Sequence, residues 1–405
     1  MVDCGMNKKL LVLFLTLSWL AGCATWQQKP ENPPQGLVLK WEPGIPPNRL
    51  GGYVMVKGYK LFVWLDTGAY TSFYYHLRKS EKFLSVLGKP LSVTPEVENF
   101  PYFRNNPQHV KRYRFAKLPL PGFSVEPFVV DDVSGYIDLS SRDTPTEGLV
   151  LGTRGFEDSW LVWNAQNLTL TVYPRGSSFK IPKGWRPIPA AIVSRAGLLF
   201  LKAKQNGKPF WLFFDSGAPN AFPYVNEAKA STWLVEGRYS RFSTGFGELQ
   251  VGSDFAWGGE NLHHPLVYIN TMMPLGNARV GFPWLSGCDW AVYYSDHVQF
   301  YAKIPAHWAR AHTSMFPFGV TLKMTPSGWR LFVEGLVGSS QGNFAPQLPA
   351  INTEIEKVDG KVVAGKDWPW VNQAMMFDNK ITLTWQQGHQ QHTETFTRSI
   401  RAKSS

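Results

Sequence analysis

Two short stretches of the chain share a residue pattern that can do chemistry. Each places an aspartate at the end of an apolar run and follows it with a hydroxyl residue, a glycine and an alanine. The two stretches are Asp66-Thr67-Gly68-Ala69 and Asp215-Ser216-Gly217-Ala218. Two carboxylates that share one proton can act as base and acid toward a single water molecule. We therefore predict Asp66 and Asp215 as a catalytic pair.

The residues that follow each aspartate have physical reasons of their own. Gly68 and Gly217 permit a tight loop whose backbone amides approach the carboxylates. The hydroxyls of Thr67 and Ser216 can form hydrogen bonds across to the opposite strand. We therefore predict that these four residues support the active-site loops.

The elements that carry the two aspartates form an internal repeat. The first copy has strand-like runs at residues 52–56 and 61–65, and the second has them at 198–203 and 210–214. Each pair of runs flanks a glycine-containing turn, so each copy predicts a hairpin that ends in its aspartate. The repeat predicts two lobes that contribute one aspartate each.

An apolar element that ends in glycine follows each hairpin: Val150-Leu151-Gly152 in the first copy and Arg279-Val280-Gly281 in the second. The paired loops resemble those of the pepsin and retropepsin families of aspartic proteases, and the two glycine elements resemble the strand that threads behind each loop. The second element departs from that pattern at its first position, where Arg279 replaces an apolar residue.

The resemblance covers residues 38–303 and implies a mainly β, two-lobed acid-protease β-barrel fold. It also implies an aspartic-type endopeptidase that needs no metal and no cofactor, and whose partner is a protein or peptide substrate. The alternative that the sequence leaves open is the same fold without activity, as a peptide-binding module or scaffold.

The composition fits a folded, largely β protein. Hydrophobic residues make up 44% of the chain and charged residues 18%, which argues against disorder. The net charge of +11 favours an anionic neighbour. No basic helix or run of Lys and Arg concentrates that charge, so nucleic acid is not expected as a partner. We expect a monomer.

The start of the chain has the form of a secretion signal. Lys8 and Lys9 precede an apolar run at 10–21, which is shorter than the roughly 20 residues of a membrane span. The following Leu-Ala-Gly-Cys, ending at Cys23, resembles a bacterial lipobox and implies a lipid on Cys23. Ala24 after the cysteine implies an outer-membrane lipoprotein that faces the periplasm. An ordinary signal peptide or a buried apolar helix is the alternative.

These observations divide the chain into five predicted segments. They are the signal peptide and lipobox at 1–23, a tether at 24–37, protease lobe 1 at 38–175, protease lobe 2 at 176–305, and a smaller β-rich domain at 316–400. The run from Val358 to Val363 resembles a hairpin of PDZ domains, which bind a peptide by adding it to a sheet edge. A plain structural β domain is the alternative for this segment.

Other candidate sites are weaker. Cys288 has no motif that would make it a nucleophile, so we expect a small buried side chain. His263 and His264 lack a third metal ligand at a suitable spacing, and on a strand they would point to opposite faces. The flap over the cleft is not assigned, although residues 100–114, with Tyr102 and Tyr113, as well as 243–247 and 257–259, are candidates.

Overall fold

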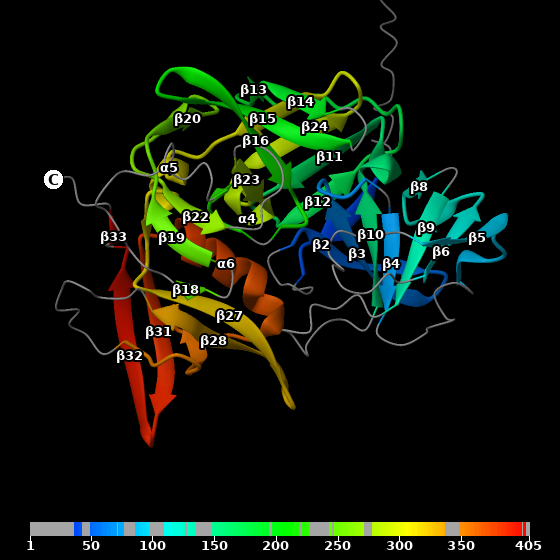
Figure 1. Cartoon of the computed structure of the whole chain (residues 1–405). Coiled ribbons are helices and arrows are strands. Elements are labelled where there is room, and N and C mark those ends of the chain that lie inside the picture. The colour runs from blue at the N-terminus through cyan, green and yellow to red at the C-terminus, as the bar shows by residue number, and fades with distance from the viewer. Residues whose placement is uncertain are drawn as a thin grey trace, which may run out of the picture. The chain divides into compact units, whose positions relative to one another are not determined.

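The computed structural model shows a mainly β protein, which confirms the predicted fold class (Figure 1). It describes residues 36–42, 49–70, 72–76, 86–97, 109–125, 128–134, 147–193, 197–218, 220–226, 243–244, 247–270, 278–336, 348–398 and 400–401. The predicted signal peptide, Cys23 and nearly all of the tether lie outside these residues. None of the helices in the described ranges has the length and hydropathy of a membrane span.

The first predicted hairpin is formed by β2 (Gly51–Val56) and β3 (Tyr59–Asp66). Lys57 and Gly58 both have positive φ, at 47° and 81°, the backbone of a tight hairpin turn that matches the twist of the strands. The apolar side chains of β3 from Leu61 to Leu65 are buried. Strand β10 (Glu147–Gly152) runs parallel to β3 and places Gly152 opposite Asp66.

The same sheet extends beyond β10 in the order β2-β3-β10-β4-β9-β6-β5. The added strands are β4 (Ser72–His76), β9 (Phe128–Ser134), β6 (His109–Phe115) and β5 (Ser92–Val97).

The second predicted hairpin repeats this arrangement. It consists of β15 (Leu198–Gln205) and β16 (Lys208–Asp215), joined by a turn in which Asn206 and Gly207 again have positive φ. Strand β23 (Ala278–Gly281) runs parallel to β16 and places Gly281 opposite Asp215. Each aspartate is therefore the last residue of a central strand, with a glycine of the threading strand beside it.

A further sheet joins the two halves of the repeat. Its order is β1-β12-β11-β24-β25-β13, and its central pair is β11 (Ser159–Asn164) against β24 (Asp289–Tyr294). The other strands are β1 (Leu37–Lys40), β12 (Thr169–Val172), β25 (Gln299–Lys303) and β13 (Arg186–Ile188). Because one continuous ladder of hydrogen bonds links the lobes, this sheet restricts their relative movement.

The C-terminal segment has its own sheet and its own hydrophobic cluster. The sheet order is β27-β28-β29-β31-β32, with β30 paired to β29 and helix α6 (Trp368–Phe377) between β30 and β31. The strands are β27 (Phe318–Thr325), β28 (Gly328–Leu336), β29 (Glu354–Val358), β30 (Lys361–Val362), β31 (Lys380–Gln387) and β32 (Gln390–Thr397). The run from Val358 to Val363 forms a hairpin, since Val358 pairs with Lys361. Its likeness to a PDZ domain and the five segment boundaries remain predictions.

Candidate active site

Asp66 and Asp215 lie close enough for their carboxyl groups to share a hydrogen bond. Each carboxylate is also held by its own loop. The Gly68 amide donates a hydrogen bond to Asp66 Oδ1 at 2.7 Å, and the Gly217 amide donates one to Asp215 Oδ1 at 3.0 Å. The two aspartates are 149 residues apart in the sequence, as are the loop residues Thr67 and Ser216 that follow them, and the structure brings them together.

The hydroxyl residues interlock the two loops. The amide of Thr67 donates to Ser216 Oγ at 3.0 Å, and the amide of Ser216 donates to Thr67 Oγ1 at 2.9 Å. Each hydroxyl then donates to a carbonyl of the opposite strand, Thr67 to Phe214 at 2.7 Å and Ser216 to Leu65 at 2.7 Å. The predicted crossing is therefore present, and it satisfies both the donor and the acceptor capacity of each buried hydroxyl.

Gly68 and Gly217 lie at positions where a larger residue has no room. A Cβ added at Gly68 would lie 2.6 Å from Cγ of Asp215, and one added at Gly217 would lie 2.4 Å from Cγ of Asp66. Each glycine therefore packs against the carboxyl group of the opposite lobe, and any larger residue would push the two aspartates apart. The sequence analysis predicted the glycines for their loop conformation, whereas the structure adds this contact across the interface.

The environment of Asp66 favours its protonated form. Loss of hydration and the neighbouring charge of Asp215 raise the pKa of Asp66 to about 7, while Arg49 and the Gly68 amide act in the opposite direction. Asp215 is buried, whereas Asp66 retains limited access to solvent. One carboxyl group of the pair can therefore carry a proton while the other remains a carboxylate, which is the state that activation of a water molecule requires.

Arg279 reaches the pair from β23. Its Nη1 lies 3.3 Å from Asp215 Oδ2, and its guanidinium carbon lies 5.5 Å from the ring centre of Tyr224. The sequence analysis recognised Arg279 only as a departure from the apolar pattern and missed its contact with the aspartate. A charged residue at a position that should face the core was the signal that could have indicated it.

The surroundings of Cys288, His263 and His264 indicate structural roles. Cys288 has a fully buried, unpaired thiol, and burial raises the pKa of Cys288 well above its usual value. His263 and His264 follow strand β21 (Glu260–Leu262) and both approach Asp254, so the prediction that they would face opposite ways is wrong. They lie in a turn, where the alternation of a strand does not apply. The described residues contain no cluster of ligands that could hold a metal ion.

The structure describes only some of the residues that the sequence offers as flap candidates. Residues 100–108, including Tyr102, and residues 245–246 lie outside the described residues, while Tyr113 lies in β6 and stacks on Phe115. Gly258 and Gly259 form the turn between β20 (Phe255–Trp257) and β21, and the preceding Trp257 is buried against Trp284. This turn is therefore anchored in the core.

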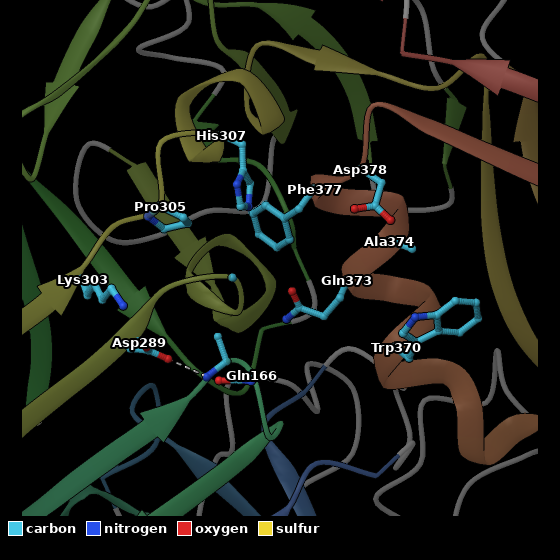
Figure 2. Close-up of a pocket in the computed structure, with 12 residues that line it drawn as sticks. Gln166, Asp289, Lys303, Pro305, His307, Trp370, Gln373, Ala374, Phe377 and Asp378 are labelled. Atoms are coloured by element: carbon cyan, nitrogen blue, oxygen red, sulfur yellow. Dashed lines mark hydrogen bonds between the residues drawn. The ribbon is translucent and has the colours of Figure 1, made fainter. Parts of the chain in front are cut away.

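A pocket of about 450 Å³ lies away from the two aspartates, neither of which lines it. Figure 2 shows Gln373 and Phe377 projecting from α6 toward Gln166 and His307. Gln373 donates a hydrogen bond to the Ser286 carbonyl at 2.8 Å, so the pocket lies beside a contact between α6 and the residues that follow β23. We assign the chemistry to the aspartates, because their carboxyl groups act on each other and are held by two interlocked loops.

Comparison with known proteins finds similarity only among solved structures. No protein-family model matches the chain, and no curated protein matches its sequence. The crystal structure of basic 7S globulin from soybean is 8% identical, covers 68% of this chain and 96% of its own, and gives a TM-score of 0.40. Conglutin gamma, a basic 7S globulin from lupine seeds, is also 8% identical, with coverages of 66% and 95% and a TM-score of 0.37. Neither structure is similar enough to assign a family to this chain, and the description of its two lobes rests on its own repeated hairpins and interlocked loops.

Proposed function

We propose that the protein is an aspartic endopeptidase that hydrolyses peptide bonds with a water molecule activated between Asp66 and Asp215. The observation that carries this proposal is the pair of carboxyl groups within one hydrogen bond of each other, held by two interlocked loops. Two carboxyl groups so placed can share one proton, and the shared proton makes one a base and the other an acid.

The reaction needs these two groups, a water molecule and the substrate. The ionised carboxylate takes a proton from water as the water oxygen attacks the peptide carbonyl carbon. The protonated carboxyl group gives its proton to the carbonyl oxygen, which produces a tetrahedral diol. The proton taken from water then passes to the peptide nitrogen, the C–N bond breaks, and the diol returns its proton to the pair. The products are a carboxylic acid and an amine, and the dyad is regenerated with one proton.

Digestion of a peptide library by the wild type and by Asp66→Asn and Asp215→Asn tests the proposal. Asparagine keeps the size of the side chain but cannot exchange the proton, so each variant should lose at least about 10²-fold in kcat/KM. Asp296→Asn, at an exposed position, is the matched control and should cleave like the wild type. Equal absence of cleavage by all four proteins, each shown to be folded, would instead support the peptide-binding module.

The C-terminal sheet suggests a second peptide contact within the same function. Among the described strands, β27 pairs on one side only, with β28, so it forms an edge of the sheet. We propose that this PDZ-like unit receives an extended peptide along β27. Binding of a peptide set by a chain that carries Val320→Pro, which removes a backbone donor from β27, should be weaker than binding by the wild type, whereas Lys361→Pro in the distant β30 should leave it unchanged.

The proposed setting is the bacterial cell envelope, with a lipid on Cys23 that holds the protein at the outer membrane and faces it toward the periplasm. The support is the sequence pattern around Cys23. Expression in a Gram-negative host should give a membrane-bound protein whose N-terminal cysteine carries fatty acids detectable by mass spectrometry. Cys23→Ser should abolish the modification. An unmodified wild-type protein would contradict this part of the proposal.

A further inference from the structure

The two lobes differ at one equivalent position beside the aspartates. In the first lobe, the parallel pairing of β3 and β10 places Val150 opposite Trp64, two residues before Gly152. In the second lobe, the pairing of β16 and β23 places Arg279 opposite Phe213, two residues before Gly281. Val150 is fully buried, whereas Arg279 extends its guanidinium to Asp215. At this position the second lobe therefore has a cation that the first lobe lacks.

One other cation, Arg49, acts on the pair in the opposite sense by lowering the pKa of Asp66, but burial and the charge of Asp215 outweigh it. Arg49, which precedes β2, lies with its guanidinium 4.6 Å from the ring centre of Trp64 and acts on Asp66 through space. Tyr294 of β24 also faces Asp66, and burial raises the pKa of Tyr294 well above its usual value, so it stays neutral. Tyr224 of β17 (Tyr224–Asn226) lies beside the Arg279 guanidinium. Among the described residues, Arg279 is the cation within ion-pair distance of a carboxylate of the dyad.

We propose that Arg279 is a positioning residue that holds Asp215 in its ionised form and so assigns the shared proton to Asp66. Guanidinium groups remain charged at every working pH, and a cation 3.3 Å from a carboxylate oxygen stabilises the ionised form. The side chains of Arg279 and Asp215 are only 21% and 9% exposed, so solvent screens the pair weakly. The aromatic face of Tyr224 further holds the guanidinium in place.

The assignment gives each aspartate one role, and this consequence rests on the proposed peptidase function. Asp215 is the base that takes a proton from water, and Asp66 is the acid that protonates the peptide carbonyl oxygen. In a symmetric pair the shared proton has no preferred carboxyl group, so about half of the enzyme molecules at any moment would carry it on Asp215. Arg279 removes that equivalence before substrate binds.

Arg279→Val tests the proposal, because it gives the second lobe the residue that the first lobe already has. The acidic limb of the pH profile of kcat/KM should move to higher pH by about one pH unit or more, since a nearby cation typically shifts a carboxyl titration by 1–3 units. Arg279→Lys, which keeps the charge, should restore most of the wild-type profile. Arg279→Gln is the second neutral variant, in case valine prevents folding beside the aspartates.

A readout that needs no turnover separates this proposal from the peptidase proposal. Carboxyl ¹³C NMR of aspartate-labelled protein, with signals assigned through the Asp66→Asn and Asp215→Asn variants, should show Asp215 ionised and Asp66 protonated at pH 5 in the wild type. In Arg279→Val the two signals should approach each other. That pattern without any peptide cleavage supports the charge assignment and overturns the peptidase function. Cleavage by the wild type together with unchanged NMR signals and an unchanged pH profile in both neutral variants overturns the role of Arg279.

Discussion

At the scale of single residues, the glycines of the two loops lie where no side chain has room. Gly68→Ala and Gly217→Ala would each place a methyl group within 2.6 Å of the opposite carboxyl carbon, so the aspartates must separate. We expect a loss of kcat on the order of 10²-fold for either variant, because misplacing a reacting group by about 1 Å has an effect of that size. Steady-state kinetics on a cleaved peptide measures the loss.

Gly155→Ala is the control for these variants. An added Cβ at Gly155 would come no closer than 3.1 Å to the Ser72 hydroxyl, so the local structure can accommodate it with a small shift. Its kcat should stay within a few-fold of the wild-type value. An equal loss in all three variants would show that the contacts with the carboxyl groups are not what makes Gly68 and Gly217 necessary.

The hydroxyls of Thr67 and Ser216 should contribute to stability as well as to geometry. Thr67→Val leaves the amide of Ser216 and the carbonyl of Phe214 without their partner inside the protein. Because an unsatisfied buried polar group costs about 1–3 kcal/mol, we expect the free energy of unfolding to fall by roughly 2 kcal/mol or more. Ser216→Ala should have a similar effect, and the two losses should not add in the double variant because the residues share one network.

Urea unfolding measures these losses, and the C-terminal sheet provides the control. Thr382 and Thr395 also pair through their hydroxyls, at 2.9 Å, but at the surface of the β31–β32 hairpin. Thr382→Val should change the free energy of unfolding by no more than about 0.5 kcal/mol. Additive effects of Thr67→Val and Ser216→Ala would argue against the interlocked network.

At the scale of elements, the sequence was sufficient where local rules decide the structure. Alternation of apolar residues and glycine turns indicated both β2–β3 and β15–β16, and the duplicated tetrapeptides located both aspartates. The sheet that joins β11 to β24 was not predicted, because its pairing partners are more than 120 residues apart and neither strand specifies the other by pattern. The contact of Arg279 with Asp215 escaped for the same reason, since it depends on tertiary placement.

The attachment of α6 is another feature that only the structure reveals. Arg398 is 7% exposed and donates hydrogen bonds to the carbonyls of Met375 and Met376 at the end of α6. It also donates to the carbonyls of Ala311 and Ser314, which precede the C-terminal sheet. One buried cation therefore connects the end of α6 with the segment that precedes the C-terminal sheet, and its charge favours the helix C-terminus.

Removing this cation should destabilise the protein strongly. Arg398→Met leaves several buried carbonyl groups without a donor, so the free energy of unfolding should fall by about 3 kcal/mol or more. Arg330→Met is the matched control, because Arg330 is 34% exposed and its ion pair with Glu354 is long, at 3.8 Å. That variant should lose less than about 1 kcal/mol. Equal losses in urea unfolding would contradict the role given to Arg398.

At the scale of the whole molecule, His312 and Asp66 give the stability of the protein opposite dependences on pH. His312 lies 4.6 Å from Trp308 and 5.7 Å from Trp284, measured between ring centres, and burial together with the charge of Arg398 lowers the pKa of His312 to about 3. The unfolded chain therefore binds one more proton than the folded protein between about pH 6.5 and pH 3, so His312 makes the protein less stable as the pH falls.

Asp66 acts in the other direction. Because its pKa is raised to about 7, the folded protein binds one more proton than the unfolded chain between about pH 3.8 and pH 7. The stability that this group contributes is present below pH 3.8 and is lost as the pH rises through 7. Asp66 must also keep its proton for catalysis in the proposed mechanism. The basic limb of the kcat/KM profile should therefore lie near pH 7, and a profile that rises through pH 8 would contradict that role of Asp66.

Because the contributions of His312 and Asp66 to stability change in opposite directions with pH, the stabilities of two single variants should diverge as the pH falls. Between pH 7.5 and pH 4.5 the two contributions nearly cancel in the wild type. Asp66→Asn leaves only the histidine, so its free energy of unfolding should fall by roughly 2–3 kcal/mol over this range, at about 1.4 kcal/mol per pH unit. His312→Phe leaves only the aspartate, so its free energy should rise by a similar amount. Urea unfolding at both pH values measures the difference. If the free energy of unfolding had the same pH dependence in both variants, the shifted pKa values of Asp66 and His312 would be contradicted.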